Sequence, residues 1–132
     1  GDADIRQDFP GGWKDDTNNA FMANGRTAEQ AKYFDFSKKV LNWRKNKDVI
    51  HTGKLTHYIP ENNVYVYFRH NDKETVMVVI NNASDSQKIN LERFQENIKV
   101  FNFGNDILSG KAIDLKSELS IEGKTSMILE LK

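Results

Sequence analysis

The stretch KLTHYIPENNVYVYFRHNDKETVMVVINN, residues 54–82, decides the class of fold. Apolar and polar side chains alternate in it with a period of two, over three separate runs, and this alternation is typical of β-strands. PENN at 60–63 and ND at 71–72 separate the runs and are typical of tight turns. Three strands joined by short turns predict an antiparallel meander. The runs are KLTHYI 54–59, VYVYFRH 64–70 and ETVMVVINN 74–82.

Shorter strand patterns continue through the rest of the chain. ERFQEN at 92–97 predicts a short helix or a turn, and GND at 104–106 predicts a turn. TSMILELK at 125–132 alternates cleanly and predicts a final strand. Short strands at roughly ten-residue spacing predict a mainly β protein, an antiparallel β-sandwich. The other strand-like pieces are QKINL 87–91, DILSG 106–110, KAIDL 111–115 and LSIEG 119–123.

An amphipathic helix precedes the strands. Thr27 is followed three residues later by Gln30, which is the spacing of a capping box at a helix N-terminus. Apolar side chains then recur at intervals of three and four, and such a stripe predicts a helix with one buried face. The stripe is wide, so we expect it to lie on a larger body than the strands alone provide. It consists of Tyr33, Phe36, Val40 and Trp43, widened by Phe34 and Leu41.

Residues 1–26 are polar, rich in Gly and Asn, and predict a long loop. Their acidic side chains raise the question of catalysis, because glycoside hydrolysis needs two carboxyl groups held across the scissile bond. No predicted helix or strand holds these carboxylates in place, so a solvated acidic loop is the simpler interpretation. The residues concerned are Asp2, Asp4, Asp8, Asp15 and Asp16.

The composition restricts the classes of function. The chain has 132 residues, of which 38% are hydrophobic and 29% charged, as is typical of a folded domain. Lys plus Arg equals Asp plus Glu at 19 each, so we expect neither nucleic acid nor an anionic membrane as partner. The sequence contains no cysteine, no apolar run of membrane-spanning length and no HExxH-type spacing around His51, His57 or His70. We therefore expect no metal and no cofactor, and the compartment stays open.

Two tyrosines form a candidate binding surface. Tyr65 and Tyr67 fall on one face of a predicted strand, and Val64, Val66 and Phe68 fall on the other. A tyrosine pair offers flat apolar faces with polar tips, on which sugar rings can stack. The alternative is that a neighbouring element covers this face.

Several motifs follow one another in a characteristic order: GDADIRQDFPGGW 1–13, NAF 19–21, GRT 25–27, KKVLNWRKNKDVIHTGKLTHYIP 38–60, VYVYFR 64–69, VMVVINN 76–82 and ILEL 128–131. In this order they resemble the C-terminal part of α-amylase-family enzymes, glycoside hydrolase family thirteen. The likeness is strongest to the neopullulanase and cyclomaltodextrinase branch, and it covers essentially the whole chain. Its most specific pieces are DFPGGW and the pair LNWRKN and IHTG.

The resemblance implies an architecture, a (β/α)8 catalytic barrel followed by an antiparallel C-terminal domain of Greek-key type. Residues 1–53 would be a remnant of the barrel, the loop after its last strand plus its last helix, and residues 54–132 the β-sandwich domain. The helix stripe would then pack on the barrel sheet. The family's catalytic carboxylates lie on earlier barrel strands, and the motifs that carry them do not occur in this sequence. The resemblance thus implies a parent that hydrolyses α-glucosidic bonds in starch-type oligosaccharides, with retention, and a piece that is inactive alone.

The resemblance also implies one substrate contact in the parent. In this branch an Asp and an Arg four residues later bind glucose hydroxyls, and Asp2 and Arg6 match that spacing in DADIR. A carboxylate accepts hydrogen bonds from sugar hydroxyls and a guanidinium donates to them. The sequence departs from its relatives at Ala3, since they often carry a proline in this segment.

The expected partners follow from the same resemblance. They are the catalytic barrel of the same chain and, for the parent, an α-glucan oligosaccharide. The helix stripe is also a candidate for self-association of the isolated chain, because large apolar patches are seldom left open to water. The alternative function is an α-glucan-binding β-sandwich module that presents Tyr65 and Tyr67. Specificity for α-1,4 or α-1,6 bonds depends on barrel loops outside this sequence.

Overall fold

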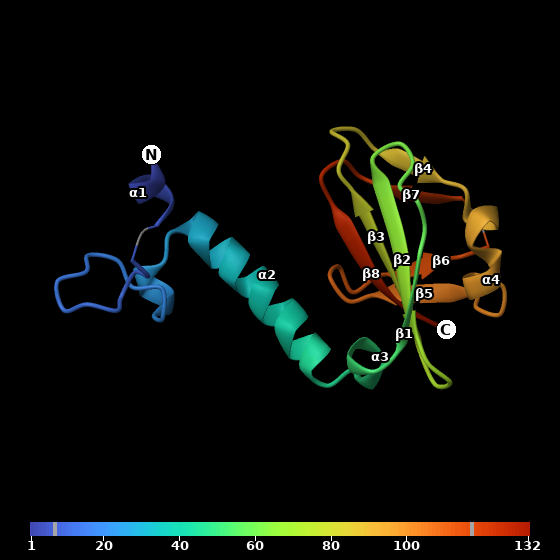
Figure 1. The fold of residues 1–132 in the computed structure, drawn as a ribbon, viewed down its shortest axis with the longest axis horizontal. Helices are drawn as coiled ribbons and strands as arrows, with labels where there is room; N and C mark the ends of the chain where they lie inside the picture. Colours follow the sequence, from blue (N-terminus) through green and yellow to red (C-terminus); the bar gives the residue numbers. More distant parts are fainter. Residues whose placement is uncertain (7, 117) are drawn as a thin grey trace. The chain divides into compact units, whose positions relative to one another are not determined.

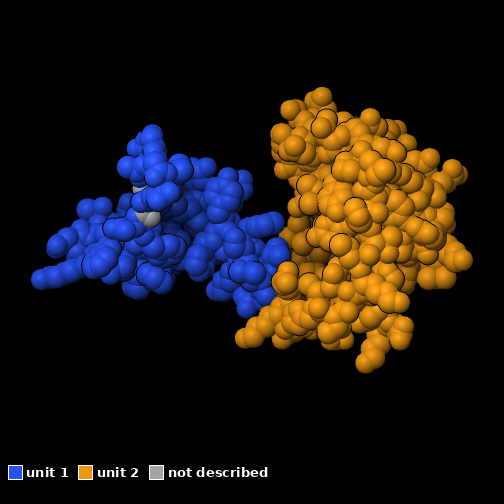
Figure 2. Space-filling model, viewed as in Figure 1, with its two compact units in different colours: residues 1–42 blue, residues 43–132 orange. Residues whose placement is uncertain are grey.

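The structure, a computed structural model, describes residues 1–6, 8–116 and 118–132. Gln7, in the predicted loop, and Ser117 lie outside the described residues. The chain forms two compact units, Gly1–Asn42 and Trp43–Lys132, which Figure 2 draws in different colours. The predicted boundary at residue 53 separates a barrel remnant from a sandwich, and it stays a prediction.

Helices occupy the first part of the chain and strands most of the second (Figure 1). Among the described residues, no helix combines the length and the apolar character needed to cross a bilayer. The helices are α1 Asp2–Ile5, α2 Ala28–Lys45, α3 Asp48–His51 and α4 Gln95–Ile98, with the 3-10 helices η1 Ala23–Gly25 and η2 Leu91–Phe94. The strands are β1 Lys54–His57, β2 Val64–His70, β3 Thr75–Asn81, β4 Gln87–Ile89, β5 Phe103–Asp106, β6 Ala112–Asp114, β7 Leu119–Ile121 and β8 Ser126–Leu131.

The strands form an antiparallel sandwich, which confirms the predicted fold class. One sheet has six strands in the order β1-β2-β3-β8-β5-β6, and the other consists of β4 and β7. The predicted antiparallel meander is confirmed, because β2 pairs with β1 and with β3; Tyr67 of β2 lies opposite His57 of β1 and Val78 of β3. The last strand, β8, pairs between β3 and β5, so the end of the chain forms an interior strand of the larger sheet.

The main core lies between the two sheets. Strand β2 buries Val64, Val66 and Phe68 in it, while the intervening tyrosines face the other way. Strands β4 and β7 and the segment η2–α4 supply the opposite wall. Each fully buried side chain of this size stabilises the fold by about 1.5–3 kcal/mol. The other members are Met77, Val79, Ile89, Leu91, Phe94, Ile98, Leu115, Leu119, Ile121, Leu129 and Leu131.

A second, smaller cluster covers part of the outer face of the six-stranded sheet. Val49 of α3 is fully buried against Val76 and Val78 of β3. Strand β3 is therefore buried on both faces along this stretch, which explains its unbroken apolar run. Four half-buried residues pack around the cluster: Trp43, Ile50, Tyr67 and Ile128.

Two sequence predictions for residues 104–110 are wrong. GND at 104–106 is part of strand β5, and DILSG contributes the turn after that strand rather than a strand of its own. Glycine often indicates a turn in a sequence, but here glycine is required because the neighbouring strand leaves no room for a side chain at position 104. A Cβ on Gly104 would lie 2.8 Å from the Leu129 Cβ. The chain turns instead at Asp106, whose carboxylate accepts hydrogen bonds from the N–H groups of Leu108 and Ser109.

Helix α2 confirms the predicted helix and its capping box. The Thr27 N–H donates to Gln30 Oε1 at 2.9 Å, and the Gln30 N–H donates to Thr27 Oγ1 at 3.2 Å. Every residue of α2 is exposed or half-buried, and Tyr33 is 64% exposed. The predicted apolar stripe is therefore open at Tyr33, Phe34, Phe36 and Leu41, whereas Trp43 packs against the second cluster.

Candidate functional site

The two sequence-predicted substrate residues lie side by side. Asp2 begins the short helix α1, and Arg6 follows its last residue, Ile5. The Arg6 Nε lies 3.2 Å from Asp2 Oδ2, and the two side chains are 77% and 68% exposed. An exposed ion pair of this kind contributes little to stability. Because both side chains are exposed, their polar atoms are accessible to a ligand. That the pair binds sugar hydroxyls stays a prediction.

One of the loop's own aspartates organises the residues between α1 and α2. Asp16 Oδ2 accepts hydrogen bonds from the Gly11 N–H at 2.7 Å and from the Trp13 N–H at 3.1 Å. The rings of Phe9 and Phe21 lie 5.2 Å apart across the loop. The Asp16 carboxylate is therefore bound by backbone amides of its own loop.

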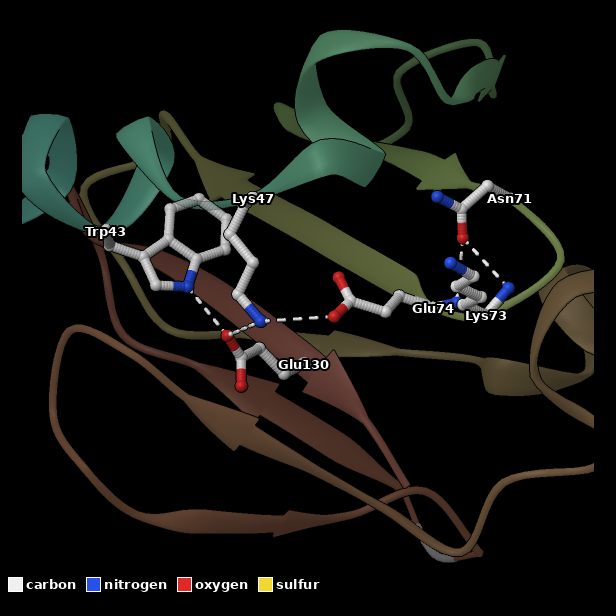
Figure 3. A network of polar contacts seen from close by, with 6 residues as sticks. All are labelled: Trp43, Lys47, Asn71, Lys73, Glu74 and Glu130. Atoms are coloured by element: carbon white, nitrogen blue, oxygen red, sulfur yellow. Dashed lines mark hydrogen bonds and ion pairs between the residues drawn. The ribbon is translucent and has the colours of Figure 1, made fainter.

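A network of polar contacts joins the last turn of α2 and the segment after it to the six-stranded sheet (Figure 3). Glu130 of β8 is its centre. Its Oε1 accepts a hydrogen bond from Trp43 Nε1 at 2.7 Å and lies 2.8 Å from Lys47 Nζ. Lys47 Nζ also lies 3.6 Å from Glu74 Oε1. Lys47 and Glu130 are only 22% and 23% exposed, so water screens this ion pair less than a surface pair.

Both charged groups at the centre of the network are stabilised as ions. Burial raises the pKa of Glu130, but the hydrogen bonds from Lys47 and Trp43 outweigh it and leave the pKa below its ordinary value. Burial lowers the pKa of Lys47, but Glu130 and Glu74 outweigh it and leave that pKa raised. Glu130 is therefore a carboxylate and Lys47 an ammonium at neutral pH.

These charged groups suit a structural contact between the segment 43–47 and the sheet rather than catalysis. A cavity of about 240 Å³ opens beside the network. A general acid for glycoside cleavage needs a raised carboxyl pKa, whereas that of Glu130 is lowered. Lys47 also contacts both Glu130 and Glu74, so neither is a free base. The charged residues that line the cavity are Lys47, Asp72, Lys73, Glu74, Glu130 and Lys132.

Asp106, a buried carboxylate, also has hydrogen-bond partners within the fold. Asp106 accepts hydrogen bonds from the Ser109 hydroxyl and from the N–H of Ile128. Burial raises its pKa, but these hydrogen bonds and others from the backbone leave the pKa lowered. Within residues 1–6, 8–116 and 118–132, no group of three or more His, Asp or Glu side chains is placed to hold a metal ion.

The structure brings the two candidate tyrosines together on the outer face of the six-stranded sheet. The ring centroids of Tyr65 and Tyr67 are 5.5 Å apart, with 35° between the ring planes. Both side chains are half-buried. The His57 ring lies 6.3 Å from that of Tyr65, nearly perpendicular to it, and extends the group onto β1.

Sequence reasoning missed the network around Glu130. The sequence pattern shows Trp43 only as part of an apolar stripe. Hydrophobic periodicity carries no information about which acceptor its indole N–H will bind. Glu130 stands between Leu129 and Leu131, so alternation alone places it away from the core. Its partner Trp43 is 87 residues earlier, and only the position of β8 beside β3 brings the two together.

A comparison with protein families matches residues 55–130 to the family described as the cyclo-malto-dextrinase C-terminal domain. The match begins within β1 and ends within β8, so it covers the sandwich. It spans more than half of the chain.

Solved structures share the fold. The α-amylase from Geobacillus thermoleovorans, complexed with acarbose, has a TM-score of 0.63 and 19% identity over 81% of this chain and 24% of that one. AmyP in complex with maltose has a TM-score of 0.67 and 15% identity over 79% and 21%. The trehalulose synthase MutB from Pseudomonas mesoacidophila MX-45 has a TM-score of 0.60 and 21% identity over 75% and 18%. The chain thus spans about a fifth of their length, and at such identities the likeness shows the fold alone.

Proposed function

The chain belongs to the family of cyclo-malto-dextrinase C-terminal domains, the C-terminal domain of α-amylase-family enzymes, and on this premise we propose its role. It is the non-catalytic C-terminal piece of a neopullulanase-like or cyclomaltodextrinase-like hydrolase. The parent cleaves α-glucosidic bonds in starch-type oligosaccharides. Maltose and acarbose in complexes of the similar structures support this substrate class.

The network at Glu130 is the observation that carries the proposed role. Trp43 lies in the last turn of α2 and Lys47 in the short segment between α2 and α3, and both contact the same carboxylate of β8. Two charge-assisted contacts therefore hold the segment 43–47 on the sandwich. Under this proposal α2 is the last helix of the barrel, and residues 1–53 are the barrel's remnant. The open stripe of α2 is the surface that would pack on the barrel sheet.

The partners of three carboxylates support an inactive fragment. Retaining hydrolysis uses one carboxylate as nucleophile and a second carboxyl group as acid. Glu130 is held by Lys47 and Trp43, Asp106 by Ser109 and backbone amides, and Asp16 by the Gly11 and Trp13 amides. The nucleophile and acid/base of the parent lie in its barrel.

Asp2 and Arg6 have a role in the parent under this proposal. They would lie on the loop after the last barrel strand, at the strand ends where such barrels bind substrate. The exposed carboxylate and guanidinium, 3.2 Å apart, suit a pair of neighbouring sugar hydroxyls. In the isolated chain the pair has no catalytic partner to serve.

The test is incubation of the purified chain with starch, pullulan and cyclodextrins, with reducing ends measured over time. We expect no release above that of a buffer control. Turnover that co-elutes with a homogeneous chain, and that Asp2→Ala or Glu130→Gln abolishes, would overturn the proposal. Turnover unaffected by these variants and removed by further purification identifies a contaminant and leaves the proposal in place.

A further inference from the structure

The outer face of the six-stranded sheet carries an aromatic group that the network does not use. Because Val64, Val66 and Phe68 point into the core, Tyr65 and Tyr67 point to the opposite face. Strand register adds His57, which lies directly opposite Tyr67 on β1. The three rings form a continuous group, with centroids 5.5 Å apart for the tyrosines and 6.3 Å apart for His57 and Tyr65.

The group is held in place from one side. Tyr67 packs against the cluster of Val49, Val76 and Val78, which fills the neighbouring part of the same face. Burial, followed by the nearby Tyr65, raises the pKa of Tyr67, so its hydroxyl stays protonated at neutral pH. A ring fixed by packing loses little conformational entropy when a ligand binds.

The other side of the group is open. Leu55 of β1 is 54% exposed, and Ile80, directly opposite Tyr65 on β3, is 39% exposed. The tyrosines are half-buried, and His57 is exposed. The surface therefore combines flat apolar faces with two phenol hydroxyls and an imidazole at their edges.

We propose that Tyr65, Tyr67 and His57 form a surface site for an α-glucan chain, separate from any site in the parent's barrel. A pyranose ring has an apolar face of C–H groups and a rim of hydroxyls. The apolar face can stack on an aromatic ring while phenol and imidazole groups bind the rim. Two tilted rings side by side offer places for two successive sugar units. The choice of an α-linked glucan rests on the proposed function, since the parent acts on that polymer.

The test is affinity electrophoresis of the intact chain in native gels with and without amylopectin, with maltoheptaose as a soluble competitor. We expect amylopectin to retard the chain and maltoheptaose to relieve the retardation. Tyr65→Ala should weaken binding about tenfold, which is ~1.4 kcal/mol, the scale of one aromatic stacking contact. Tyr65→Phe keeps the ring and should retain most of the binding.

The matched control is Tyr33→Ala, which removes an exposed tyrosine from α2 and should leave the retardation unchanged. Circular dichroism of each variant separates lost binding from lost folding. An unretarded wild-type chain overturns the site, as does equal retardation of the wild type and Tyr65→Ala. If the face instead serves protein association, Tyr65→Ala alters the sedimentation coefficient without any effect of amylopectin, and this result also overturns the site. Binding and turnover are measured separately, so loss of this site leaves the proposed role untouched.

Discussion

The indole Nε1 of Trp43 donates a 2.7 Å hydrogen bond to the carboxylate of Glu130, which lies 87 residues later in the last strand. The contact joins the last turn of α2 to β8, an interior strand of the larger sheet. Lys47, at 2.8 Å from the same oxygen, adds a positive charge. One carboxylate of β8 therefore contacts both Trp43 and Lys47.

We predict that Trp43→Phe lowers the free energy of unfolding of the sandwich by about 1.5 kcal/mol. The variant keeps most of the packing and removes one hydrogen bond to a charged acceptor, for which this is the usual scale. Urea unfolding followed by circular dichroism measures the change. Trp13→Phe is the matched control, because Trp13 is 68% exposed, and it should shift the midpoint very little. Equal effects of the two substitutions would contradict a fastening role for the Trp43 N–H.

We predict that acid weakens the fold through Glu130 and Asp106. The folded-state pKa of each carboxyl lies below its unfolded value. The stability each group contributes is therefore present above the unfolded pKa, about 4, and is lost as pH falls through the folded pKa. Urea midpoints measured from about pH 7 down to about pH 3 should decline most steeply in this acid range. The decline should be smaller in Glu130→Gln than in the wild type, and an equal decline would assign the loss to other groups.

We predict that the Tyr58 hydroxyl ionises at a higher pH than an ordinary tyrosine. Burial, and then the hydrogen bond to Glu96, raises its pKa from 10.0 to about 12. A raised folded-state pKa contributes stability that is complete below the unfolded pKa and is lost as pH rises through the folded one. Phenolate absorbance should therefore show late ionisation, and Tyr58→Phe should reduce its amplitude, while Tyr67, whose pKa is also raised, keeps a part of it. Tyr33→Phe should keep the full amplitude. If the absorbance change at high pH were equally large in both variants, the late-ionising tyrosine would be a residue other than Tyr58.

The meander was the most predictable part of the fold, for reasons visible in particular residues. Alternation in 64–70 sets which side chains enter the core. Asn62 and Asn63, at the PENN turn, have φ values of 50° and 60°, a conformation that asparagine tolerates well. Here local chemistry and tertiary structure agree, so sequence reasoning succeeds.

The prediction failed where a distant neighbour decides. Strand β5 carries glycine at position 104 because Leu129 of β8 leaves no room for a Cβ there. Nothing near position 104 in the sequence encodes that contact. The network at Glu130 was missed for the same reason, since it depends on which strand lies beside β3. The spacing of Asp2 and Arg6 is visible in the sequence and the structure pairs the two side chains, whereas their binding of sugar hydroxyls stays a prediction.

We predict that Gly104→Ala destabilises the sandwich by about 1–3 kcal/mol, the usual cost of overpacking a core. The added Cβ would lie 2.8 Å from Leu129 Cβ and 3.1 Å from Leu131 Cδ2, so strands β5 and β8 would have to shift. Gly12→Ala is the matched control, because its nearest contact would be 3.4 Å. Thermal unfolding of both variants measures the difference. A Gly104→Ala chain as stable as the control would contradict the close approach of β5 and β8.

We predict that the isolated chain self-associates through the open stripe of α2. Tyr33 and Phe36, one helical turn apart, are 64% and 49% exposed, and apolar surface of this kind favours burial against another molecule. Sedimentation velocity should show a sedimentation coefficient that rises with concentration. The double variant Tyr33→Lys and Phe36→Lys should remain monomeric, because it places two charges on the associating face. Glu29→Lys, which changes charge in the first turn of the same helix, should associate like the wild type. A wild-type chain that sediments as a monomer at every concentration would show that the stripe does not drive association, and the role proposed for it in barrel packing would then need a different experimental basis.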